Sequence, residues 1–247
     1  TMQIVVAIQV ALFLIVWFAS PYAVLPRPGE VLASFQDLWF KQGLAENLAT
    51  SFKLNLTALA WTTVISLLLS YLTVVPFFRP IVNALSKGRY LSLVGFSLVF
   101  TLMLGGGQSL KLALLIFGMT VYFVTSMASV VAAIPKAEFD HARTLRMGEW
   151  RVVWEVVILG TADKALEVMR QNAAIGWTLL TMVEGISRAE GGLGNLLLTQ
   201  QKYFRIADVF AIQITILVLA LVQDWFIGTV RKAVCPYADL TLERKEG

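Results

Sequence analysis

Few residues in this chain could do covalent or metal chemistry. The sequence has one histidine, His141, and one cysteine, Cys235. A multi-histidine metal site, an internal disulfide and a thiolate cluster are therefore excluded. An intramembrane enzyme needs paired aspartates, a serine with a histidine, or histidine clustered with glutamate. One histidine in a polar stretch does not supply these, so we expect neither catalytic residues nor a metal site.

Polar side chains inside an apolar segment are a second kind of candidate, because such groups are costly at membrane depth and often mark a solute pathway. Glu184 is the strongest, since a carboxylate in a span is rare, although a pair with Arg188 at i+4 explains it equally well. For threonine, a bond to the i−4 carbonyl or a helix contact is the ordinary explanation. The pathway candidates are Gln171, Asn172, Thr178, Thr181 and Glu184.

The composition places these side chains in a membrane protein. Hydrophobic residues make up 57% and charged residues 15%, with a mean hydropathy of +0.73, whereas a soluble domain has about 45–50% apolar and about 25% charged residues. The net charge of +4 comes without an aromatic-studded basic stripe. We therefore expect the basic residues to orient the chain in a membrane and not to bind nucleic acid.

The apolar runs predict an all-α integral membrane protein with about six transmembrane helices. In hydrocarbon, backbone N–H and C=O groups can hydrogen-bond only to one another, and a helix satisfies them within one segment. A β-barrel would show alternating ten-residue strands instead. The first run could be a signal peptide, but no basic residue precedes Arg27, which favours a membrane helix. The predicted spans cover residues 2–19, 54–77, 90–104, 110–134, 165–186 and 209–230, within one domain, 1–247, whose core runs from about 50 to 234.

The lysines and arginines predict the orientation, because the membrane potential and anionic lipid hold them in the cytoplasm. Twelve lie on one side of the predicted spans and seven on the other. We therefore expect both termini and the polar stretch 135–164 to be cytoplasmic. The larger group is Arg79, Lys87, Arg89, Lys136, Arg143, Arg146, Arg151, Lys164, Arg231, Lys232, Arg244 and Lys245. The smaller group is Arg27, Lys41, Lys53, Lys111, Arg188, Lys202 and Arg205, and Arg170 lies inside the fifth span.

The polar stretch contains a predicted amphipathic helix that begins at Pro135, which suits a first helical position. Phe139, Ala142 and Leu145 recur on one face, and a second helix is predicted over residues 149–159. Such a helix either rests on lipid or inserts its apolar face into a groove of a soluble partner. Periodicity alone favours the lipid interpretation.

The same segment resembles the EAA loop of type I ABC importer permeases, in the branch that handles sulfonates, taurine, nitrate and similar small solutes. That loop reads roughly E-A-A-R-x-L-G-A-x-x-W-x-x-F-x-x-V-V-L-P. Asp140, His141 and Ala142 occupy the E-A-A positions, and Trp150 falls at the tryptophan of the family. Arg146 replaces the family's glycine.

The resemblance extends over about residues 21 to 236. The segment 25–32, Leu-Pro-Arg-Pro-Gly-Glu-Val-Leu, is similar to the L-P-S-P-x-E-V-L that follows the family's first helix. Glu184 and Gly194 have the spacing of its E-M-x-x-x-x-x-G-L-G, and Asp224 matches an aspartate of its last helix. The order and spacing of these pieces carry the resemblance.

The resemblance implies the MetI-like permease fold in a bacterial inner membrane. Two permeases, identical or related, would form a pathway for a small solute: an anion such as sulfonate, taurine, nitrate or bicarbonate, or a vitamin-like compound. The implied partners are a dimer of ATP-binding subunits, a second permease, a periplasmic substrate-binding protein and lipid. ATP and Mg would be bound by the partner, so this chain needs no cofactor. The implied ATPase-coupling residues are Glu138, Phe139, Asp140, His141, Ala142, Arg143, Leu145 and Gly148.

Two alternatives remain open from the sequence. An auxiliary membrane subunit without its own pathway would explain the altered EAA positions. A channel or secondary transporter that works without an ATPase predicts inverted repeats or broken helices with charges at the midplane. The sequence shows neither of these features clearly.

Overall fold

The computed structural model describes residues 25–187 and 190–236, with a few isolated positions before residue 25. The predicted first span at 2–19 and Arg188 lie outside the described residues, so these predictions remain predictions. Within the described part of the chain, every regular element is a helix, as the all-α prediction requires.

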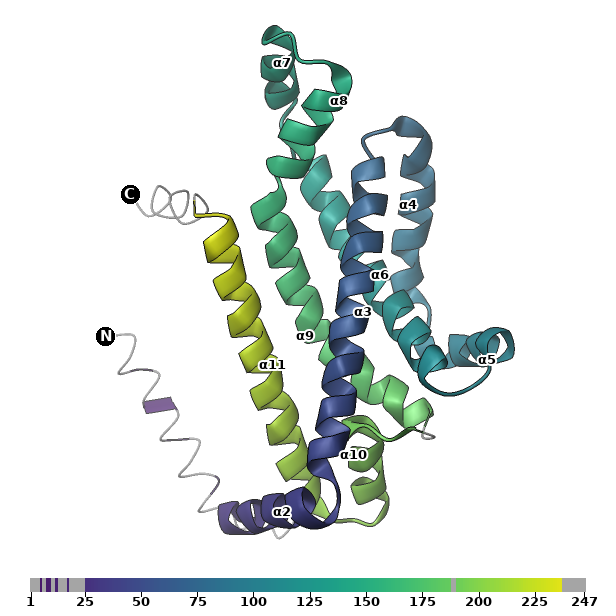
Figure 1. The fold of residues 1–247 in the computed structure, drawn as a ribbon, viewed down its shortest axis with the longest axis vertical. Coiled ribbons are helices and arrows are strands. Elements are labelled where there is room, and N and C mark those ends of the chain that lie inside the picture. The colour runs from purple at the N-terminus through teal and green to yellow at the C-terminus, as the bar shows by residue number, and fades with distance from the viewer. Residues whose placement is uncertain are drawn as a thin grey trace.

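Four long helices form the body of the molecule (Figure 1). They are α3 (Leu44–Leu72), α6 (Gln108–Ala132), α9 (Ala162–Ile186) and α11 (Ile206–Val234). Helix α6 packs against α3 and α9, and α9 packs against α11. Helices α3, α6 and α11 are long and apolar enough to cross a membrane. Helix α9 is the most polar of the four.

The segment between α3 and α6 is a bent pair of helical pieces. The first piece contains η1 (Pro76–Phe78), α4 (Arg79–Ser86) and η2 (Lys87–Tyr90), and the second is α5 (Leu93–Leu104). The two pieces meet at 112°. Figure 1 shows α4 beside α6 and α5 turned away from the bundle.

This bent pair corrects the predicted third span. Helix α5 has 12 residues, about 18 Å of helix, which is too short for a hydrocarbon core of about 30 Å. If the bent pair counts as one span, the described residues contain up to four, so the predicted count of six is not confirmed. The second span was predicted at 54–77, but α3 is Leu44–Leu72, because residues 44–53 continue the helix to pack on α2 and α10.

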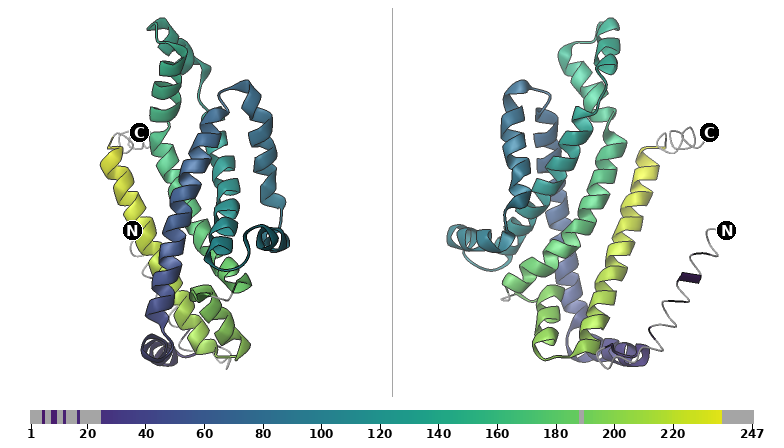
Figure 2. Two further views of the ribbon diagram at one scale, coloured as in Figure 1. Left: turned by 45° about the vertical axis from the view of Figure 1, so that its right-hand side comes forward. Right: turned by 180° about the vertical axis from the view of Figure 1, so that it is seen from behind.

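The two ends of the bundle are built differently (Figure 2). At one end, which we call the closed end, α2 (Pro28–Lys41) and α10 (Leu193–Lys202) lie against the long helices. At the opposite end, α7 (Lys136–Thr144), α8 (Glu149–Val152) and the π-helix η3 (Val153–Leu159) project beyond the other helices. We call these three elements, residues 136–159, the hairpin, and we call their end of the molecule the hairpin end.

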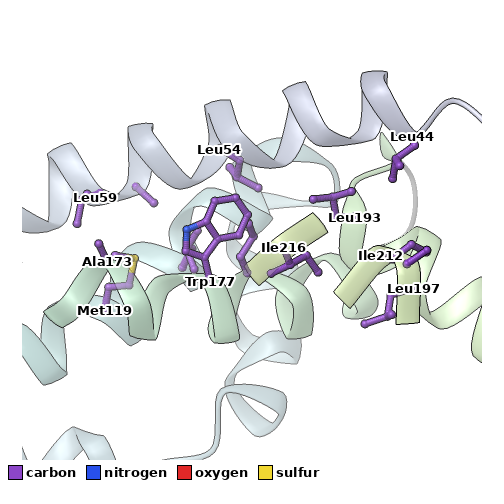
Figure 3. Close-up of a cluster of buried hydrophobic side chains, with 14 of the residues drawn as sticks. Leu44, Leu54, Leu59, Met119, Ala173, Trp177, Leu193, Leu197, Ile212 and Ile216 are labelled. Carbon is purple, nitrogen blue, oxygen red and sulfur yellow. The ribbon is translucent and has the colours of Figure 1, made fainter. Parts of the chain in front are cut away.

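The main apolar core joins α3, α6, α9, α10 and α11. Figure 3 shows Trp177 of α9 at its centre, between Leu54 of α3 and Ile216 of α11. A second cluster nearer the hairpin includes Phe123 of α6 and Val157 of η3. These clusters hold α9 in place along most of its length.

The positions of Lys87 and Arg89 differ from the predicted orientation. A Cβ built on Gly88 would lie 3.4 Å from a methyl group of Val121, and Val121 lies near the middle of α6. Lys87 and Arg89 therefore lie at mid-bundle level, and their prediction as residues of a loop at the cytoplasmic end was wrong. The reason is that α4, which starts at Arg79-Pro80, folds back along α6.

Candidate functional site

The turn after α7 has the backbone conformation that glycine favours. Pro135 is the N-cap of α7, and Leu145 follows its last turn. Arg146 has φ +56°, the left-handed conformation that favours glycine. The N–H of Met147 donates to the Ala142 carbonyl at 3.3 Å and closes the turn. The family's glycine thus corresponds to a position with positive φ, which Arg146 occupies here.

The apolar face of α7 is mostly turned toward the chain itself. Phe139 packs in the second core cluster, beside Val153 and Val157, and Ala142 is only 4% exposed. Both residues therefore pack at least partly against the chain itself, and their contact with a partner remains a prediction. Of the three predicted apolar contacts, Leu145 is the exposed one, with 58% of its surface accessible.

A groove of about 440 Å³ runs along the hairpin, lined by four residues of the predicted coupling set: Glu138, His141, Ala142 and Leu145. Asp140 and Arg143 lie outside this groove, and Arg143 approaches Asp140 at 3.8 Å and Glu149 at 3.5 Å. Gly148 is the N-cap of α8. The groove is lined mostly by apolar side chains together with Glu138, His141 and Glu155, a composition suited to an inserted side chain.

The π-helix connects the hairpin to α9. It ends where the N–H of Gly160 donates to the Glu155 carbonyl at 3.1 Å. A Cβ on Gly160 would lie 2.4 Å from the Val156 carbonyl oxygen, so glycine is required by this close approach. Single π turns within α-helices occur frequently at functional sites, and this one joins the projecting unit to a long helix of the bundle.

Ion pairs tie the hairpin-side half of α9 to α11. The guanidinium of Arg170 binds both carboxylate oxygens of Asp224, at 2.6 and 2.7 Å. Arg231 donates to Glu167 at 2.8 Å. Displacement of the hairpin would therefore be transmitted to α11 as well as along α9.

At the closed end, Glu184 is fully buried and holds the loop before α10. Its carboxylate accepts hydrogen bonds from the Ser51 hydroxyl at 2.5 Å and from the Gly194 N–H at 2.7 Å. The Leu193 N–H donates in turn to the Ser51 oxygen at 2.8 Å. The side chain predicted to face a pathway is thus enclosed, and its geometry is that of a structural clamp.

Further bonds complete this clamp. Asn47 accepts the Gly192 N–H at 2.7 Å, and buried Lys111 donates to the Gly191 carbonyl at 2.9 Å. Gly192 has φ +110°, and a Cβ there would lie 2.3 Å from a Glu184 oxygen. Both reasons require glycine, which accounts for the glycine-rich sequence of this loop.

The remaining pathway candidates divide between two faces of α9. Gln171 and Thr178 lie on an exposed face, and Thr181 donates to the Thr178 carbonyl at 2.9 Å. Asn172 is 2% exposed, and within the described chain its amide has no hydrogen-bond partner. Gln171 and Thr178 are therefore the candidates that face open space.

Helix α6 adds two serines that the sequence analysis did not single out. Its exposed positions Ser126 and Ser129 follow the exposed Tyr122 at helical spacing. Tyr122 also borders a hollow of about 210 Å³, together with Arg89 and Ser92 of the bent pair and Met182 of α9. A three-to-four residue spacing of hydroxyl groups was the available signal for this face.

Comparisons with known proteins identify the fold. No protein-family model matches this sequence, and no curated protein matches it. The chain is similar in structure to a chain of the MetNI methionine ABC transporter, solved in inward-facing conformations. The TM-score is 0.61 and the identity 16%, over 81% of this chain and 98% of that chain. The predicted MetI-like architecture is thereby confirmed, and the branch of the family remains a prediction.

Proposed function

We propose that this chain is a permease subunit of an ATP-driven importer. Together with a second copy or a related permease, it would form the pathway for a small solute. The observation that carries the proposal is the hairpin, which projects beyond the bundle in a chain that shares its fold with a chain of an ABC transporter. The ATP-binding subunits would dock there, and ATP and Mg would be held by them.

The hairpin has the properties that docking requires. Leu145 offers an exposed apolar side chain beside the groove, and Glu138 and His141 supply a polar rim. An apolar anchor within a polar rim is the usual anatomy of a binding site between proteins. The inward packing of Phe139 gives the hairpin a firm attachment to the second core cluster.

Transmission into the membrane would follow α9. The hairpin continues through the π-helix into α9, and the pairing of Arg170 with Asp224 links α9 to α11. Exposed Gln171 and Thr178 lie on α9 itself. Closure of the ATPase dimer would thus bias the packing of the helix that carries the pathway candidates. A substrate-binding protein would deliver solute at the closed end, on the opposite face of the membrane.

Copurification with the ATP-binding subunit tests this proposal. We would replace Leu145 with aspartate and use Trp154→Asp as the control, because the two side chains are 58% and 57% exposed and only Leu145 lines the groove. In Leu145→Asp, docking of the ATPase would bury the new carboxylate without a partner. The free-energy cost of this burial should reduce recovery of the ATPase by about tenfold or more. Equal recovery in both variants would contradict docking at the groove.

A stand-alone secondary transporter is the second candidate, and the bent helix pair favours it. Broken helices with a charge at mid-level are a feature of that class, and Arg89 lies beside such a break. Solute flux into liposomes that contain only this chain, without ATP, would favour this alternative. The importer proposal predicts that flux requires both the ATPase and ATP.

A further inference from the structure

Helix α2 lies across the closed end and leaves an apolar flank uncovered. It packs against α3 and α11, and it runs crosswise to these two helices, which are long and apolar enough to span a membrane (Figures 1 and 2). Val31 and Leu38 of α2 are buried in the main apolar core. Leu32 and Trp39 follow them by one residue each on the neighbouring flank, where they are 69% and 42% exposed. An open apolar flank on a helix that lies crosswise to membrane spans is expected of a helix in the plane of the membrane interface.

The opposite flank of α2 is charged. Glu30, Asp37 and Lys41 recur at spacings of seven and four residues, which places them on one side of the helix, and all three are exposed. At 3.6 residues per turn, that side lies roughly opposite Leu32 and Trp39. Lys41 donates a hydrogen bond to Asp37 at 2.8 Å. Helix α2 therefore offers an apolar side to lipid and a charged side to water.

The end of α2 meets the end of α10 in a group of exposed aromatic side chains. The two ends are joined where the side-chain amide of Gln200 donates to the Gln42 side-chain oxygen at 2.5 Å. Basic residues accompany them, Lys41 on α2 and Lys202 on α10, and both are exposed. Aromatic rings with nearby lysines are typical of the level at which a protein passes from hydrocarbon to headgroups. We call the aromatic residues the collar: they are Trp39, Phe40, Tyr203 and Phe204.

The backbone at Phe204 indicates a contact for this ring outside the chain. Phe204 has φ +54°. Its N–H donates to the Gln201 carbonyl, and the N–H of Arg205 donates to the Gln200 carbonyl, both at 3.1 Å. This is the helix ending at which glycine is the usual residue, so a phenylalanine in this conformation is strained. Because the Phe204 side chain is 86% exposed, burial within the chain does not offset the strain, whereas contact with an external apolar phase would.

We propose that α2 and the collar anchor the closed end in the headgroup region of the lipid bilayer. Leu32, Phe35 and Trp39 lie against the acyl chains nearest the headgroups, and Lys41 and Lys202 reach the lipid phosphates. The rings of Phe35 and Trp39 are stacked with their centroids 5.8 Å apart, so they form one continuous apolar surface. Lysine is depleted in interfaces between proteins and suits the headgroup level at helix ends, which favours lipid over a soluble partner. The inference goes beyond the proposed function, because it holds whether or not an ATPase docks at the hairpin.

Nitroxide labels on the full chain, in nanodiscs of phosphatidylcholine and phosphatidylglycerol, test the proposal. Cys235 is first replaced with alanine, and a single cysteine is then introduced as Leu32→Cys or, as the matched control on the charged flank, as Asp37→Cys. Electron paramagnetic resonance measures the access of oxygen, which concentrates in hydrocarbon, and of a water-soluble nickel chelate. The ratio of oxygen to nickel access should be about tenfold or more higher at position 32 than at position 37, because hydrocarbon excludes the polar chelate. A second pair, Trp39→Cys and Lys41→Cys, should show the same order and keeps the test decisive if one variant does not fold.

Two results would overturn the inference. Equal access of the nickel chelate to both flanks would place α2 in water and leave this face to a soluble protein. Exclusion of both oxygen and nickel from positions 32 and 39 would mean that protein covers the flank, either another part of this chain or a second copy. Neither result bears on copurification with the ATPase at the hairpin, so failure of the anchor and failure of the importer proposal are distinguishable.

Discussion

The closed end and the hairpin end of α9 are held by different kinds of contact. At the closed end, Glu184 and Lys111 are buried and bonded to the loop before α10. At the hairpin end, α9 is held by the apolar contacts of the second cluster, which Phe139 joins, and by ion pairs to α11 such as Arg170–Asp224, whose side chains are 36% and 38% exposed. Exposed ion pairs contribute about 0–1 kcal/mol, whereas a buried group that loses its partner costs about 1–3 kcal/mol. The closed end of α9 is therefore held by buried hydrogen bonds, and the hairpin end by apolar packing and partly exposed ion pairs.

The largest expected effect comes from removing the carboxylate of Glu184. Glu184→Ala leaves the Ser51 hydroxyl and the Gly194 N–H without their acceptor, and should cost about 3 kcal/mol. Glu184→Gln keeps one acceptor oxygen and should cost less. The unfolding temperature in detergent measures both, with exposed Thr178→Ala as the control on the same helix. An unchanged midpoint in Glu184→Ala would remove the distinction between the two ends.

A smaller loss is expected at the junction between the hairpin and α9. In Gly160→Ala the new methyl would overlap the Val156 carbonyl, so the π-helix has to rearrange at about 2 kcal/mol. Gly29→Ala in α2 is the control, because a Cβ there meets no atom within 4 Å and Gly29 lies outside the predicted coupling set. Thermal unfolding and ATPase copurification should both be impaired in Gly160→Ala. Normal copurification in this variant would argue against a mechanical role for the junction.

The link between α9 and α11 should contribute about 1 kcal/mol. Arg170 and Asp224 form a bidentate pair, but their side chains are 36% and 38% exposed, so solvent screening reduces the gain. A double-mutant cycle with Arg170→Ala and Asp224→Ala measures the coupling. A coupling indistinguishable from zero would mean that α11 does not follow α9 through this pair.

The smallest expected effect on stability is at the tip of the hairpin. Leu145 is exposed, so Leu145→Asp should change the free energy of unfolding by less than about 0.5 kcal/mol. Its effect should appear in partner binding alone. A marked fall in the unfolding temperature of this variant would show that Leu145 supports the fold of the hairpin.

Local features of the sequence predict the long helices well. For α6, α9 and α11 the predicted bounds differ from those observed by at most four residues, because helices in lipid satisfy their own backbone groups. The order of motifs also predicts the fold that the structural comparison supports. These features depend on residues close together in the chain.

Features decided by distant packing were missed. The prolines at 76 and 80 indicate an interruption of the helix, but the direction of α4 afterwards is set by α6. The spacing of Phe139 identifies an apolar face of α7 without identifying what covers it. A carboxylate at Glu184 suggests function by its rarity, whereas Ser51, 133 residues away in the chain, makes it part of a clamp.

Site-specific photo-crosslinking in intact cells tests the central claim most directly. A benzophenone amino acid would replace Leu145 at the hairpin or Phe204 at the closed end, both exposed apolar positions at 58% and 86%. The account predicts a crosslink from position 145 to a soluble ATP-binding subunit, identified by mass spectrometry, and none to that subunit from position 204. A crosslink to the ATP-binding subunit from position 204, or to lipid alone from position 145, would contradict it.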